Sequence, residues 1–171
     1  MKTKLVSLAL ACTLSLAPCS VYAKERVKKL PTYHTCDRSD SSKMVLACNI
    51  YKEARGEGLK GMLAVGMVTL NRLDHDKFPA SIRGVVYQKK QFSWTTYKHG
   101  LKIHDKESWD KAVSVAEFLI TLKKLPVAYN IFDFTGGSLY YHSCRVKPYW
   151  IAHFIRTVAV GNHVFYKLKE T

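Results

Sequence analysis

The sequence predicts one α+β domain that is mostly helical and ends in a small C-terminal β-hairpin. Two apolar-rich segments, 44–55 and 59–72, carry apolar residues on helical spacing and meet at a glycine-containing corner. A third such repeat covers residues 109–120. Near the end of the chain, Gly161-Asn162 separates two runs rich in β-branched and aromatic residues, a pattern typical of a two-residue hairpin turn.

The first 23 residues are interpreted as an export signal. Lys2 and Lys4 precede an apolar run from Leu5 to Leu16, and Val21-Tyr22-Ala23 offers a small-residue cleavage site. Because the run is too short to span a bilayer permanently, we expect no stable membrane anchor. A retained signal anchor, or a lipid on Cys19, is the alternative. The mature protein is therefore expected in the periplasm, the cell wall or the medium.

The remaining chain divides into a basic arm, residues 24–40, and one folded domain, residues 41–171. Removing 23 of the 171 residues leaves 148, enough for a domain with its own core. The whole sequence carries a formal charge of +14, and about +12 after signal cleavage. Such a charge indicates an anionic partner. Export favours wall polymer over nucleic acid, and we expect a monomer.

The cysteines leave the disulfide pattern open. Five are present, and Cys12 and Cys19 belong to the signal segment. The other three, Cys36, Cys48 and Cys144, are an odd number, so at least one thiol is unpaired within the chain. Cys36 and Cys48 could join the arm to the first helix, but Cys144 could compete for either partner.

The first helix is expected to start at a cap among Asp40, Ser41 and Ser42. Its buried face includes Met44, Cys48 and Tyr51, and Gly56 and Gly58 end it. Glu53 then lies on the last turn, at the half-buried edge of that face. Burial removes hydration from a carboxylate and favours its neutral form, which makes Glu53 a candidate proton donor.

Later elements follow from the same signals. Residues 59–72 leave almost no polar face and are expected to form the central buried helix, with Gly61 and Gly66 marking close packing. Pro79 is expected to open a short helix. Residues Gln91 to Trp94 should form an irregular loop. The helix containing Trp109, a core residue by its spacing, is expected to be capped by Asp105 or Ser108 and to end before Pro126.

Several short motifs of the chain resemble those of a known family. The matching residues are Asn49-Ile50-Tyr51 with Glu53 to Glu57, Ala64-Val65-Gly66, Leu70-Asn71-Arg72, Gln91 to Trp94, Thr135-Gly136-Gly137, Tyr140-Tyr141-His142, Pro148-Tyr149-Trp150 and Ile155 to Tyr166. In this order they are similar to the SleB-like cell-wall hydrolases, the family typified by spore-cortex-lytic enzymes. The resemblance covers most of the chain from about Met44 onward.

The resemblance implies a lysozyme-like fold that cleaves the glycan strands of peptidoglycan with one catalytic glutamate, matched by Glu53. It implies no metal and no cofactor. Glu57 is either a second carboxylate or a structural partner of Arg55 or of a backbone donor. Trp94 is either a stacking platform for a sugar or a core residue. The full set expected to bind substrate is Glu57, Gln91, Ser93, Trp94, Gly136, Tyr140, Tyr141 and His142.

The resemblance favours a lytic transglycosylase, in which Glu53 protonates the glycosidic oxygen and the muramic 6-hydroxyl attacks C1. A muramidase that uses water is the first alternative. A metal-dependent amidase or peptidase is the second, although His142, His153 and His163 lack the spacing of a zinc helix. Nucleophilic catalysis by Cys144 with His142 as its base is disfavoured, because side chains two positions apart on a strand point in parallel and not toward one another. A basic binding protein without activity would explain the charge but not Glu53.

Overall fold

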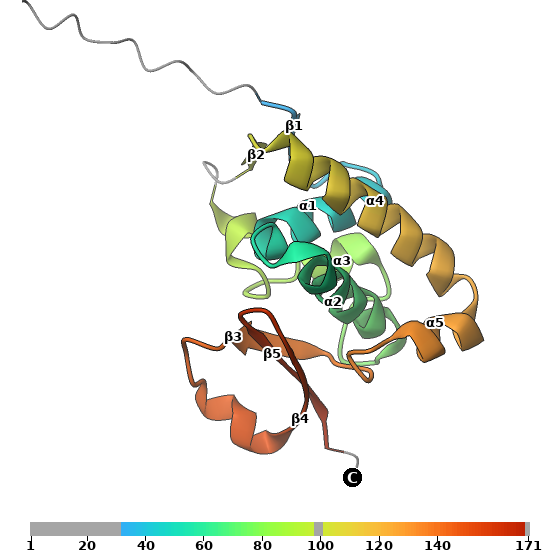
Figure 1. Ribbon diagram of the computed structural model, residues 1–171, viewed down its shortest axis with the longest axis vertical. Helices are drawn as coiled ribbons and strands as arrows, with labels where there is room; N and C mark the ends of the chain where they lie inside the picture. Colours follow the sequence, from blue (N-terminus) through green and yellow to red (C-terminus); the bar gives the residue numbers. More distant parts are fainter. Residues whose placement is uncertain (1–31, 98–100, 170–171) are drawn as a thin grey trace, which may run out of the picture.

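The computed structural model describes residues 32–97 and 101–169. The predicted export signal, residues 1–23, and the first part of the predicted arm, residues 24–31, lie outside the described residues and stay predictions. The described chain forms a helical body with a small antiparallel sheet against one side of it (Figure 1). Within these ranges, none of the helices is long and apolar enough to cross a bilayer.

Two packed helices form the centre of the body, α1 (Ser42–Ala54) and α2 (Gly58–Asn71), with α4 (Lys106–Lys123) packed across both. The Ser41 hydroxyl caps α1 by accepting the Met44 N–H at 3.4 Å. α2 is the central buried helix that the sequence predicts, because all but a few of its residues are buried. At Gly66, an added Cβ would collide with Leu119 of α4 and lie 3.1 Å from Ile50 of α1. The absent side chain therefore permits the close packing.

The corner between α1 and α2 also agrees with the prediction. α1 ends at Ala54, and Gly58 begins α2 with φ +67°, a conformation that side chains with a Cβ rarely adopt. Glu53 consequently lies on the last turn of α1, one residue from its end.

The shorter helical elements correct two details. Ser81, not Pro79, starts the short helix: its hydroxyl accepts the Gly84 N–H at 3.0 Å. Pro126 follows the end of α4 but also begins a further helix, because proline fits the first turn, where its missing N–H has no partner to lose. Asp105 caps α4 by accepting the Ser108 N–H at 3.1 Å. These elements are η1 (Arg72–Asp74), α3 (Ile82–Val86), η2 (Ser93–Thr96) and α5 (Pro126–Phe132).

The sheet has three strands rather than the two of the predicted hairpin. β4 (Phe154–Val160) and β5 (His163–Leu168) form that hairpin, with Val160 paired to His163 around Gly161-Asn162. β3 (Tyr140–Ser143) pairs with the other edge of β5, so the strand order is β3-β5-β4. The segment η4 (Tyr149–His153) leads into β4.

Part of the predicted arm is attached to the helical body. β1 (His34–Thr35) pairs with β2 (Lys102–Ile103), and Cys36 forms a disulfide with Cys48 of α1. Residues 34–36 are therefore held in place and are not a solvated tail. Cys144 is an exposed free thiol, which answers the open question of pairing.

Two hydrophobic clusters stabilise the fold. The larger lies among α1, α2 and α4 and includes the predicted core residue Trp109. The smaller consists of Ala64 and Val68 of α2 packed on Val160 and Phe165 of the sheet. The second cluster attaches the sheet to the central helix, and with it the strands that face Glu53.

We expect the Cys36–Cys48 bond to contribute about 3 kcal/mol to the free energy of unfolding, since it closes a loop with a sequence separation of 12. The double variant Cys36→Ala with Cys48→Ala should lose that amount in urea denaturation. Cys144→Ala, which removes the exposed thiol, is the matched control and should unfold like the wild type. A double variant within about 0.5 kcal/mol of wild type, the scatter of neutral surface changes, would contradict the expectation.

Candidate active site

Glu53 faces the sheet from the last turn of α1. Its Oε2 accepts a hydrogen bond of 3.1 Å from the Tyr141 hydroxyl on β3. The side chain is half-buried, as its position beside Leu46 and Ile50 predicts. A carboxyl group from the helical body and a phenol from the sheet therefore meet across 88 positions of sequence.

Burial raises the pKa of Glu53 above its ordinary value. The hydrogen bond from Tyr141 and the positive charge of Arg72 act in the opposite direction and lower that pKa, but burial is the largest cause. The carboxyl group thus keeps its proton to a higher pH than an exposed glutamate does. This is the property that a general acid needs near neutral pH.

Arg72 supplies a buried positive charge beside Glu53. The residue is only 4% exposed, and its Nε–H donates to the Leu139 carbonyl at 2.8 Å. Its guanidinium lies over the rings of Phe78, Phe92 and Tyr140. It forms no ion pair with any carboxylate of the described residues, and its Nη1 is buried without a hydrogen-bond partner. Its charge therefore acts on Glu53 without being neutralised at close range.

The structure brings five of the predicted site residues into one pocket of about 460 Å³: Glu53, Gln91, Ser93, Tyr141 and His142. Glu53 is the one carboxylate among the described residues that line it. The other lining residues are Arg72, Lys90, Phe92, Ser143 and His163.

The loop that lines this pocket is held in an unusual conformation at Lys90, where φ is 66° without a glycine. Such strain is concentrated at functional sites. The positive charges of Lys90 and Arg72 against a single carboxylate make the pocket suited to a ligand with anionic groups.

Trp94 is a correction. The prediction that it forms a sugar platform fails, because the ring is 7% exposed and belongs to the core. Its indole N–H donates to Asn49 Oδ1 at 3.0 Å, and the Asn49 amide donates to Thr69 at 3.1 Å. The alternative stated with it, a core tryptophan, describes the structure.

Glu57 lies outside the pocket and acts on the hairpin turn. Its Oε2 accepts the backbone N–H of Asn162 at 2.7 Å, and its Oε1 accepts the Asn162 side-chain amide at 3.1 Å. These bonds lower the pKa of Glu57 and keep it ionised. The structural alternative, a backbone donor as partner, is therefore present, and the contact of Glu57 with substrate stays a prediction.

Two more predicted binding residues lie elsewhere. Tyr140 is next to Tyr141, but strand alternation turns it to the other face, among Phe78, Trp150 and Phe154. Gly136 lines a separate hollow beside Asn71. The loop there is held by Asp133, which accepts the N–H groups of Thr135 at 2.9 Å and Gly137 at 3.0 Å. Contact of Gly136 with substrate stays a prediction.

His142 lines the pocket, but both of its ring nitrogens are occupied. Nδ1 donates to the Ser143 carbonyl at 2.8 Å, and Nε2 accepts from the Tyr166 hydroxyl at 3.0 Å. These two contacts leave little capacity for the predicted contact of His142 with substrate. His163, which sequence reasoning considered only as a metal ligand, is the other histidine of the pocket.

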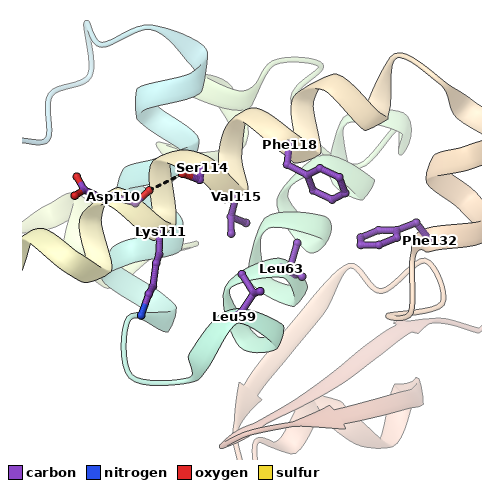
Figure 2. Close-up of a pocket in the computed structure, with 8 residues that line it drawn as sticks. All are labelled: Leu59, Leu63, Asp110, Lys111, Ser114, Val115, Phe118 and Phe132. Atoms are coloured by element: carbon purple, nitrogen blue, oxygen red, sulfur yellow. Dashed lines mark hydrogen bonds between the residues drawn. The ribbon is translucent and has the colours of Figure 1, made fainter.

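Two further features of the described residues lie apart from this pocket. His34, Cys36 and Cys48 are close enough for a metal, but the two sulfurs are joined in the disulfide. A second pocket lies between α2, α4 and α5, where Leu59, Leu63, Val115, Phe118 and Phe132 surround an apolar hollow (Figure 2). Its charged members, Asp110 and Lys111, are each paired with a neighbour one turn away on α4.

Two relatives are similar to this chain in sequence. The spore cortex-lytic enzyme of Oceanobacillus iheyensis is 28% identical over 130 residues, which are 75% of this chain and 42% of the relative. The corresponding enzyme of Bacillus cereus is 30% identical over 131 residues, 75% of this chain and 45% of the relative. This chain thus spans less than half the length of these relatives.

Solved structures resemble the same region. The catalytic domain of the Bacillus cereus SleB protein aligns with a TM-score of 0.56 at 27% identity, covering 81% of this chain and 95% of that domain. The catalytic domain of the germination-specific lytic transglycosylase SleB from Bacillus anthracis aligns with the same TM-score and identity, covering 77% of this chain and 100% of that domain. The expected α+β, lysozyme-like fold class is therefore confirmed.

The family assignment rests on more than half of the chain. The sequence pattern of the family described as Cell Wall Hydrolase matches residues 56–166, beginning three positions after Glu53. That range includes Arg72, Tyr141 and His163, so the family pattern covers the wall of the pocket that faces the acid. Together with the solved domains, this match shows that the chain belongs to the cell wall hydrolase family.

Proposed function

We propose that this protein is a lytic transglycosylase that cleaves the bond between N-acetylmuramic acid and N-acetylglucosamine in peptidoglycan. The observation that carries the proposal is Glu53, a half-buried carboxyl group with a raised pKa that is the one carboxylate among the described residues of its pocket. The similarity to a domain described as a lytic transglycosylase supports it. We also propose that the enzyme acts outside the cytoplasm, where this polymer is found.

The reaction needs one acid and no protein nucleophile. Glu53 transfers its proton to the glycosidic oxygen, and the bond from that oxygen to C1 of the muramic acid breaks. The muramic 6-hydroxyl oxygen bonds to C1 and gives its proton to the Glu53 carboxylate, which restores the acid. The products are a 1,6-anhydro end and a new 4-hydroxyl group, with no water consumed.

The pocket favours this route over a mechanism with two carboxylates. Glu57 is the nearest candidate for a second carboxylate by sequence, but its two oxygens are bound to Asn162. An internal nucleophile requires only that the sugar be held with its 6-hydroxyl near C1, which makes the attack intramolecular. Arg72 and Tyr141 stabilise the carboxylate form of Glu53 that exists between the two proton transfers.

Glu53→Gln should lower the rate of peptidoglycan cleavage by about 10²-fold or more, because the amide has no transferable proton. Release of muropeptides from purified walls measures the rate, and circular dichroism checks the fold. Glu57→Gln is the matched control at the same corner, and its loss should be smaller since Glu57 acts on the turn. Near-normal cleavage by the Glu53 variant would refute its role as the acid.

Tyr141→Phe should shift the falling alkaline limb of kcat/KM to higher pH. Removing the hydroxyl removes a hydrogen bond that lowers the pKa of Glu53, so the acid keeps its proton to a higher pH. Tyr140→Phe is the control, because that hydroxyl lies on the opposite face of β3. If both variants shift the limb equally, the Tyr141–Glu53 bond is not the cause.

Glycan strands whose muramic 6-hydroxyls are O-acetylated should resist the enzyme, because acetylation removes the internal nucleophile while water is still available. Mass spectrometry of the products from unmodified strands should show 1,6-anhydro ends. Undiminished cleavage of the acetylated strands, with reducing muramic ends, would instead identify a muramidase.

A further inference from the structure

His163 is the first residue of β5 and lines the pocket of Glu53. Its Nδ1 is buried and has no hydrogen-bond partner among the described residues. Its Nε2 is neither among the buried unpartnered atoms nor bonded to a described residue. This nitrogen is therefore the accessible polar atom of a half-buried ring in the pocket wall.

The surroundings decide the charge and the tautomer of this ring. Burial lowers the pKa of His163, the nearby His142 lowers it further, and the Glu57 carboxylate raises it by less than burial lowers it. The imidazole is thus neutral near pH 7. A proton on Nδ1 would be a buried donor without an acceptor, which costs more than leaving a lone pair there. The proton consequently belongs on Nε2, the accessible nitrogen of a ring that lines the pocket.

The ring is held in this orientation from two sides. Tyr141 and Phe165 contact it edge to face, with ring centroids 5.1 and 6.3 Å away. The backbone just before it is held by Glu57, which binds both the N–H and the amide of Asn162. A donor that is placed so firmly, and has no partner among the described residues, is available to a ligand in the pocket.

We propose that His163 binds substrate: its Nε2–H donates a hydrogen bond to an uncharged oxygen of the glycan, either a hydroxyl or an N-acetyl carbonyl. This inference rests on the proposed function, because the ligand is the strand that Glu53 cleaves. A neutral donor fits an uncharged acceptor. A role as general base is disfavoured, since accepting a proton on Nε2 requires the buried Nδ1 to carry the other one.

The test is binding of soluble, peptide-free strand fragments of alternating N-acetylglucosamine and N-acetylmuramic acid. Calorimetry is done with full-length protein carrying Glu53→Gln, so that the fragments are not cut. Adding His163→Phe keeps the ring and its packing but removes both nitrogens, and should weaken binding about fivefold, the ratio expected for one neutral hydrogen bond. Adding His163→Gln places an N–H near the position of Nε2 and should restore most of the affinity.

His153→Phe, at an exposed histidine of η4 outside the pocket, is the matched control and should bind like the parent. The proposal is overturned if His163→Phe binds like the parent, or if His163→Gln is as weak as His163→Phe while both melt at the parent's temperature. If the Glu53→Gln parent binds no fragment at all, the proposed function itself fails and this inference fails with it.

Fragments with the N-acetyl groups removed distinguish the two acceptors. If His163 binds the N-acetyl carbonyl, the difference between the parent and His163→Phe should vanish on these fragments. If it binds a hydroxyl, the same fivefold difference should persist. A larger difference on the deacetylated fragments than on the acetylated ones would contradict both forms of the proposal.

Discussion

The site depends on the attachment of the sheet to the corner between α1 and α2. Two hydrogen bonds that Asn162 donates to the Glu57 carboxylate hold the hairpin turn, and Val160 and Phe165 pack on α2 beneath it. Because of this attachment, β3 and β5 present Tyr141 and His163 to the helix that carries Glu53. Glu53 comes from the helical body, and its partners come from the sheet, so a shift of the sheet against the helices would separate them.

The pKa of Glu53 follows from opposed effects where the sheet meets the helices. Burial alone would disfavour the ionised form of Glu53 and so raise its pKa further. Tyr141 and Arg72 stabilise the ionised form, but less than burial disfavours it. Arg72 can do so because it is held by aromatic rings and a backbone carbonyl rather than by a carboxylate of its own. A conventional ion pair in its place would have cancelled its field at Glu53.

Local patterns were sufficient to predict most of the helical fold. Apolar spacing located α1, α2 and α4, caps and glycines located their ends within a few residues, and Gly161-Asn162 located the hairpin. Some boundaries were misplaced because neighbouring start signals are of similar strength. The short helix, for example, was expected to begin at Pro79 but is capped by Ser81. The pairing of β3 with β5 was not predicted, because no local signal says which edge of a hairpin a distant strand joins.

The sequence by itself determined the helices, the corner and the position of Glu53 on the last turn of α1, since these depend on residues close together in the chain. The tertiary structure decided which side chains meet Glu53. The alternation of β3 turns Tyr141, and not Tyr140, toward Glu53. Packing also buries Trp94 against Asn49 and pairs Cys36 with Cys48. Glu57 binds the hairpin turn. These outcomes depend on distances between segments remote in sequence, which only the packing of the sheet on the helices sets.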